Sequence, residues 1–169
     1  PKPEREFDQL PRVTIQLPMY NEMYVAERLI DAVVKMDYPR ELLEIQVLDD
    51  STDETVAIAQ RRVHHYREQG MDISYLHRKN RKGFKAGALE EGMNVAKGEF
   101  IAVFDADFIP HKHFLTNTIH FFTSPKIAMV QMRWSHLNRN FSLMTNLQSI
   151  FLDGHFVIEH TARNRSGRF

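Results

Sequence analysis

Two carboxylates one residue apart, Asp105 and Asp107, follow the apolar run 100–104. An apolar run of this length is typical of an interior strand of a parallel sheet. In open α/β sheets, ligands bind beyond the carboxyl ends of the strands, which is where these acids are expected. Two like charges so close together require a compensating cation, and carboxylate oxygens suit Mg²⁺ or Mn²⁺ shared with substrate phosphates. An ordinary polar exit from a strand has the same appearance, so the spacing alone leaves metal binding open.

A second acidic pair, Asp49 and Asp50, ends the apolar stretch 44–48. The residues that follow, 51–53, are Ser, Thr and Asp, which suit a helix N-terminus. Capping explains these three residues but not the paired acids before them. Asp50 is therefore a candidate acceptor for a base imide N–H or a ribose hydroxyl, with a purely local role as the alternative.

A dense basic cluster follows the next apolar stretch and leads through glycines into a predicted helix at 86–96. Five basic residues fall within eight positions: Arg78, Lys79, Arg81, Lys82 and Lys85. Cations and backbone N–H groups at a helix start favour phosphate, although the spacing is not a P-loop and no G-x-G-x-x-G is present. A solvated charged loop is the ordinary alternative. Together, the three loops predict a site for a nucleotide diphosphate and its metal.

Alternating strands and helices must position these loops. We expect strands at 13–17, 44–48, 73–76, 100–104 and 128–132. We expect helices from a cap at Asn21 to a stop at 37–39, from a cap at Ser51 or Thr52 to 69–70, and at 86–96, 110–122 and 141–160. Such alternation predicts an α/β fold with a mainly parallel sheet and helices on both faces, over residues 12–169, after an extended lead-in at 1–11.

Composition bounds the class of protein. The 169 residues suit one domain, and 22 basic residues balance 22 acidic ones, which gives no argument for nucleic acid as a partner. Without cysteine, the chain has no disulfide framework, thiolate metal site or cysteine nucleophile. No apolar run approaches the ~20 residues of a membrane span. Because the chain begins without Met, we expect it to be a piece of a longer protein.

Four motifs, in this order, resemble the nucleotide-sugar half of family 2 glycosyltransferases. They are Leu-Pro-Met-Tyr-Asn-Glu at 17–22, Asp-Asp-Ser-Thr-Asp at 49–53, Lys-Ala-Gly-Ala at 85–88 and Asp-Ala-Asp at 105–107. The similarity is strongest to the processive, membrane-embedded branch of cellulose synthases and cellulose-synthase-like enzymes. The segments 130–138, 143–145 and 152–156 resemble its mannan-synthase and glucan-synthase-like members in particular. The resemblance covers residues 12–169.

This resemblance implies a Rossmann-like GT-A fold, here truncated, and an inverting glycosyltransferase. Such an enzyme moves a sugar from a UDP- or GDP-sugar donor to a glycan or lipid acceptor, with Mg²⁺ or Mn²⁺. Asp105 and Asp107 would bind the metal, and Asp50 would contact the base beside Asp49. The loop at 18–22 would border the nucleoside. The implied nucleotide-binding residues are Pro18, Tyr20, Asn21, Glu22, Asp49, Asp50, Lys82, Lys85 and Asp105.

The sequence also departs from the family. The later Thr-Glu-Asp-type motif, whose Asp is the catalytic base, is absent, as is Gln-x-x-Arg-Trp. Residues 131–134 only echo the latter, with one residue between Gln and Arg. We therefore expect the base beyond Phe169 and this piece to be inactive alone. The resemblance places the parent protein in the membrane with this part on its cytoplasmic face. The piece itself is expected to be soluble, with apolar residues in 141–158 that favour self-association.

Two other classes of protein remain as alternatives. A haloacid-dehalogenase-type phosphatase also uses Asp-x-Asp after a parallel strand, which would make Asp105 the nucleophile and Asp107 the acid. In that family the motif is usually followed by Gly or Thr and lies on the first strand. Here it is followed by Phe-Ile-Pro at 108–110, and three predicted strands precede it. A non-catalytic nucleotide-binding module is the second alternative, because the catalytic base is missing.

Overall fold

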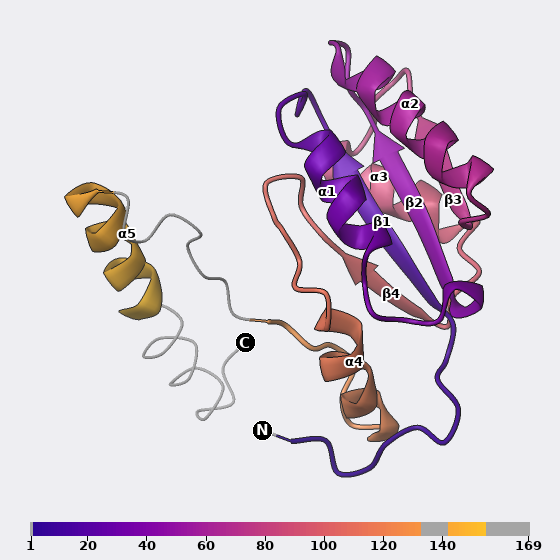
Figure 1. Cartoon of the computed structure of the whole chain (residues 1–169), viewed down its shortest axis with the longest axis vertical. Helices are drawn as coiled ribbons and strands as arrows, with labels where there is room; N and C mark the ends of the chain where they lie inside the picture. The colour runs from indigo at the N-terminus through magenta and orange to yellow at the C-terminus, as the bar shows by residue number, and fades with distance from the viewer. Residues whose placement is uncertain (1, 133–141, 155–169) are drawn as a thin grey trace. The chain divides into compact units, whose positions relative to one another are not determined.

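The structure, a computed structural model, describes residues 2–132 and 142–154 (Figure 1). The chain divides into two compact units, residues 1–128 and 129–169. The first unit contains all the strands of the described chain. Its elements are β1 (Val13–Met19), α1 (Ala26–Val34), η1 (Arg40–Leu42), β2 (Leu43–Asp49), α2 (Thr55–Glu68), β3 (Ile73–His77), α3 (Phe84–Met93), β4 (Phe100–Val103), α4 (Phe114–Thr118) and η2 (Ile119–Thr123).

The strands form a parallel sheet in the order β3-β2-β1-β4, which confirms the predicted architecture. The register pairs Val13 of β1 with Leu43 of β2 on one side and with Phe100 of β4 on the other. The chain builds outward from β1 to β3 and then returns to place β4 on the opposite side of β1. The strand order therefore reverses at β1, and this reversal positions the candidate site.

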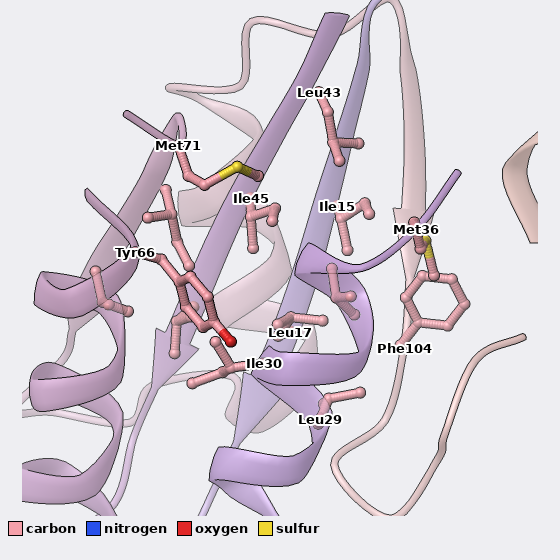
Figure 2. Packing of buried hydrophobic residues seen from close by; sticks show 14 of the residues in the cluster. Ile15, Leu17, Leu29, Ile30, Met36, Leu43, Ile45, Tyr66, Met71 and Phe104 are labelled. Atoms are coloured by element: carbon pink, nitrogen blue, oxygen red, sulfur yellow. The ribbon is translucent and has the colours of Figure 1, made fainter. Parts of the chain in front are cut away.

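Helices cover both faces of the sheet, as predicted. α1 and α2 pack side by side on one face, while α3 lies against β1 and β2 on the other (Figure 1). The apolar side chains between the sheet and the first two helices form the core, and Ile15, Leu17 and Ile45 are among its fully buried members (Figure 2). Burial on both faces explains why β1 and β2 are buried along their whole length.

The sheet face under α3 carries polar side chains in its buried layer. Thr14 Oγ1 donates to Glu44 Oε2 at 2.5 Å, and Gln16 Nε2 donates to Gln46 Oε1 at 3.0 Å. A Cβ on Gly92 of α3 would lie only 2.5 Å from Gln16 Nε2. The glycine therefore lets α3 approach this polar layer closely.

Two strand predictions were wrong: one strand has a different place in the sheet, and the other does not form. The run at 100–104 was expected in the sheet interior, but β4 pairs with β1 alone in the described chain, and Ile101 and Val103 are 38% and 44% exposed. Residues 128–132 form no strand, because β propensity without a pairing neighbour does not make one. An apolar sequence is compatible with an interior strand and with an edge strand, so the position of β4 follows only from its pairing with β1.

Helix starts differ from the expected ones for local reasons. Asn21 does not cap α1, which begins at Ala26, since its own backbone is left-handed with φ 55°. α2 begins at Thr55, and its first free N–H donates to Asp53 Oδ1 at 3.0 Å, so neither Ser51 nor Thr52 is the cap.

Two other helices differ from the expected ranges. α3 runs over 84–93 instead of 86–96. The helix expected from residue 110 begins at Phe114, after a turn, and continues from Ile119 as a 3₁₀ helix.

In the second unit, α5 (Leu143–Gly154) lies within the expected helix at 141–160, whose last residues fall outside the described ones. Leu143, Met144 and Ile150 of α5 are 79%, 65% and 53% exposed, and self-association through them stays a prediction. Over residues 2–132 and 142–154, no helix has the length and apolar character that a bilayer crossing requires.

Candidate functional site

The predicted site residues gather at the carboxyl edge of the sheet. Because all four strands are parallel, the loops after β1, β2, β3 and β4 leave from the same edge. The loops after β1 and β4 flank the reversal of strand order, where open α/β sheets bind ligands. The sequence therefore predicted that these residues share one edge of the sheet, and the tertiary structure determines how their side chains meet there.

Asn21 ties the loop after β1 to the loop after β2. Its backbone N–H donates to Ser51 Oγ at 2.8 Å, and its side-chain Oδ1 accepts from the Thr52 N–H at 3.0 Å. Asn tolerates the left-handed backbone that this arrangement needs. The neighbouring Glu22 accepts the first two N–H groups leading into α1 with its carbonyl, and Pro18 is buried within β1. These contacts fix the loop that carries Tyr20, which is 40% exposed.

Asp49 is a buried support and does not line the surface. Its side chain has no exposed surface, with Oδ1 accepting from the Ser51 N–H at 2.8 Å and Oδ2 from the Tyr75 hydroxyl at 2.7 Å. Burial, together with this hydrogen bond to a carboxylate, raises the pKa of Tyr75. Asp49 therefore holds the turn after β2, and its part in nucleotide binding stays a prediction.

Asp50 is engaged by Arg78 in a buried bidentate pair. Arg78 Nε donates to Oδ1 at 2.8 Å and Nη2 donates to Oδ2 at 2.5 Å, with the two side chains 7% and 4% exposed. The hydrogen bond to this carboxylate is the main cause that raises the pKa of Arg78, against the effect of burial. The sequence identified Arg78 only as a member of the basic cluster and did not predict its pairing with Asp50. The register of β2 and β3 places Arg78 beside Asp50, because Asp49 pairs with His77 and the residues that follow each of them are neighbours.

A cation–π contact joins the loop after β3 to the loop after β1. The Arg81 guanidinium lies 3.2 Å from the centroid of the Tyr20 ring and 5.1 Å from that of Phe84. Arg81, Gly83 and Phe84 all have positive φ, at 40°, 73° and 51°. Such a loop conformation depends on tertiary contacts, so nothing in the sequence predicted that Arg81 would cover Tyr20.

Lys85 forms an ion pair with Asp105 across the loops after β3 and β4. Both side chains are accessible, at 52% and 39% exposure, so either one can exchange its partner for a ligand. Lys82 is exposed nearby in the sequence, and its carbonyl accepts from Arg78 Nη1 at 2.9 Å. The structure thus brings together the predicted cation and one of the predicted acids.

The Asp-Ala-Asp motif presents its acids because its apolar residues point inward. Phe104 and Ala106 are 6% and 5% exposed, and the Phe104 ring packs edge-on against Phe114 with centroids 4.8 Å apart. Asp105 and Asp107, which alternate with them, are half-buried and exposed. The inward pair anchors the loop, and the carboxylates remain available to solvent.

The donor set fits a hard divalent cation that keeps part of its hydration. Across the residues with described side chains, no cluster of three or more His, Cys, Asp or Glu has the geometry of a metal site. Two carboxylates are nevertheless the usual protein share for Mg²⁺ or Mn²⁺, whose remaining positions go to water and substrate phosphates. Asp105 and Asp107 are oxygen donors of this kind, and their role as metal ligands stays a prediction.

The domain belongs to the class of open parallel α/β proteins, and its exposed acids, cationic loop and aromatic ring lie at the strand-order reversal, where such proteins bind ligands. The chain belongs to the family described as Glycosyl transferase family 2, whose sequence model matches residues 14–167. The fold is the GT-A type, as the resemblance implied. These findings give no support to the phosphatase alternative.

Plant enzymes of cellulose-synthase-like type are among its relatives. A probable glucomannan 4-beta-mannosyltransferase 7 of Oryza sativa subsp. japonica is 40% identical, with 98% of this chain and 29% of the relative aligned. Glucomannan 4-beta-mannosyltransferase 9 of Arabidopsis thaliana is 42% identical over 88% of this chain and 29% of its own. The chain therefore spans less than a third of the length of these relatives.

Two solved glycosyltransferase structures are similar to this chain in fold. The mannosyltransferase PcManGT from Pyrobaculum calidifontis, in complex with GDP-Man and Mn²⁺, matches with a TM-score of 0.64 and 32% identity, over 75% of this chain and 35% of that one. S. aureus TarS 1-349 in complex with UDP matches with a TM-score of 0.58 and 21% identity, over 74% of this chain and 40% of that one, which shows the fold alone.

Proposed function

We propose that this chain is the donor-binding part of an inverting glycosyltransferase that takes a mannosyl group from GDP-mannose and passes it to a glycan acceptor. The observation that carries the proposal is the accessible Lys85–Asp105 pair, with Asp107 two residues on, at the strand-order reversal. The preference for GDP-mannose over a UDP-sugar is supported by the mannosyltransferase relatives and by PcManGT, which was solved with GDP-Man. A lipid acceptor remains the alternative to a glycan.

Asp105 and Asp107 would hold Mg²⁺ or Mn²⁺ together with the donor diphosphate. When bound, the metal supplies Lewis-acid stabilisation of the charge on the departing diphosphate. With Asp105 engaged in this way, the Lys85 ammonium would be released from its ion pair and could meet a phosphate oxygen. The exchange is inexpensive, because an exposed ion pair contributes only about 0–1 kcal/mol. Lys82, exposed in the preceding loop, adds positive charge.

The loop after β1 would border the nucleoside, and Tyr20 offers it an accessible aromatic ring. Asn21 and Glu22 hold that loop in place. Asp50 would face the base, with carboxylate lone pairs beyond the two that Arg78 uses. Inversion requires a base that deprotonates the acceptor, and we propose that sequence following Phe169 in the parent protein supplies it. The parent is proposed to present this domain at the cytoplasmic face of a membrane.

Calorimetric titration of GDP and UDP, each with and without Mn²⁺, tests the proposal on this chain and on Asp107→Asn. Tighter GDP binding with Mn²⁺, lost in the variant, is the expected result. Glu41→Gln is the control, because Glu41 is an exposed acid just before β2, at the opposite edge of the sheet. Metal-independent binding that Asp107→Asn leaves unchanged would contradict the assigned metal site.

Two further measurements separate the alternatives. Hydrolysis of a generic phosphate ester would favour the haloacid-dehalogenase type of phosphatase. Transfer of mannose from GDP-mannose by a longer chain that includes the residues after 169 is the expected result for an enzyme. Donor binding without transfer in that longer chain would instead fit a non-catalytic nucleotide-binding module.

A further inference from the structure

Arg78 is the most fully engaged cation in the described part of the chain. It is 8% exposed and lies directly after β3. Besides its two bonds to Asp50, Nη1 donates to the Lys82 carbonyl at 2.9 Å and Nη2 donates to the Phe84 carbonyl at 2.8 Å. A guanidinium offers five N–H donors in a rigid fork, and four donor–acceptor contacts here go to its own chain. The buried Arg78 is thus occupied in holding a loop.

The held loop has a backbone that does not form by itself. Arg78 contacts the carbonyls on both sides of Gly83, and this glycine and Phe84 have φ of 73° and 51°. A left-handed backbone is unfavourable for a residue with a Cβ such as Phe84. A fixed external partner for its carbonyl therefore has a clear structural purpose. Asp50 provides the anchor from the neighbouring strand.

The first turn of α3 packs directly on this arrangement. A Cβ on Gly87 would lie 2.1 Å from the Lys82 carbonyl oxygen and 2.7 Å from Arg78 Nη1. The Gly87 N–H also donates to the Gly83 carbonyl at 3.0 Å. Lys85 lies between the two held points, Phe84 and Gly87. The position of Lys85 therefore depends on the same contacts.

We propose that Arg78 is a positioning residue for binding of the donor diphosphate. Arg78 acts through the backbone of residues 82–84, which places Lys85. This inference rests on the proposed function, and it adds a role to Asp50, whose carboxylate anchors Arg78. Loss of the Arg78 guanidinium should therefore weaken binding of the second phosphate more than binding of the nucleoside. It also loosens the loop when no ligand is present.

Hydrogen exchange of the free protein tests the loop directly. We compare Arg78→Lys, which keeps the charge but loses the fork, with Arg67→Lys as the matched control. Arg67 also donates to a backbone carbonyl, that of Ile73, at 3.0 Å, but at the other end of β3. The amides of Phe84 and Gly87 should exchange about tenfold faster in Arg78→Lys and at the wild-type rate in the control, since charge-assisted bonds of this type typically stabilise by that factor or more. Unchanged exchange at both amides would overturn the proposal.

Titration of GDP and GMP, with Mn²⁺, tests the diphosphate. Arg78→Lys should bind GDP about tenfold more weakly, with a smaller loss for GMP. Gly87→Ala should show the same GDP-selective loss while Arg78 is intact, which guards against a folding defect in the first variant. Equal losses for GDP and GMP would overturn the positioning role and leave the proposed function standing. A wild-type chain that binds neither GDP nor UDP would remove the proposed function, and with it any donor role for Arg78.

Discussion

Replacement of Lys85 by Met should change metal affinity and donor affinity in opposite directions. In the free protein, the Lys85 ammonium competes with any cation for Asp105. At 52% and 39% exposure the pair is an accessible one, which typically contributes up to about 1 kcal/mol, or about fivefold in an equilibrium constant. Lys85→Met should therefore bind Mn²⁺ alone up to about fivefold more tightly, and GDP in saturating Mn²⁺ more weakly. The free energy of unfolding, measured in urea, should change by less than about 1 kcal/mol.

Electron paramagnetic resonance of free Mn²⁺ measures the first effect, and calorimetry with GDP measures the second. The Mn²⁺ effect should shrink as the salt concentration rises, because exposed charges are screened over about 10 Å at 0.1 M ionic strength. Lys79→Met is the matched control, since Lys79 is exposed in the same basic loop. Weaker Mn²⁺ binding in Lys85→Met, or an equal gain in Lys79→Met, would refute the idea that Lys85 and the metal share Asp105.

Two predictions concern the scaffold. Gly92→Ala should lower the free energy of unfolding in urea by about 1–3 kcal/mol, because its Cβ would lie 2.5 Å from Gln16 Nε2; no loss would mean that α3 moves freely. Burial raises the pKa of Asp31, but hydrogen bonds from Arg62 and Tyr66 outweigh it and hold this pKa below its ordinary value. The carboxylate thus stabilises the fold above the unfolded-state pKa of about 4, and this is lost as pH falls through the folded-state pKa. Asp31→Asn should be less stable than wild type at pH 7 and approach it in acid; a constant difference across pH would contradict this.

Local sequence patterns were sufficient for the general arrangement of the site. The apolar runs before Asp50 and Asp105 predicted strands, and the intervening helical patterns predicted that these strands are parallel. Parallel strands end at one edge, so acids and cations that follow them had to gather there. The resemblance in four motifs added the family, which the match over residues 14–167 confirmed.

Local sequence patterns did not predict contacts between residues far apart in the sequence. A β-prone stretch at 128–132 was expected to form a strand, but a strand exists only with a pairing neighbour, and the sequence does not state which neighbours are available. Within the described residues β4 is an edge strand, which the sequence did not predict, because apolar side chains are found on both edge and interior strands. Asn21 gives a local example. Asn is a common residue both at helix caps and at left-handed positions, so the residue type did not show that Asn21 would bridge two loops instead of capping a helix.

The sequence by itself determined which chemical groups leave the sheet at its carboxyl edge, because strand order along the chain and strand direction follow from local periodicity and helical crossovers. The tertiary structure alone decided which groups meet. Asp50 meets Arg78 because the register sets β3 beside β2, and Lys85 meets Asp105 because α3 returns the chain to the other side of β1. Hydrogen bonds and ion pairs depend on distances of a few ångströms, and such distances between residues far apart in sequence are set by the packing of the whole domain.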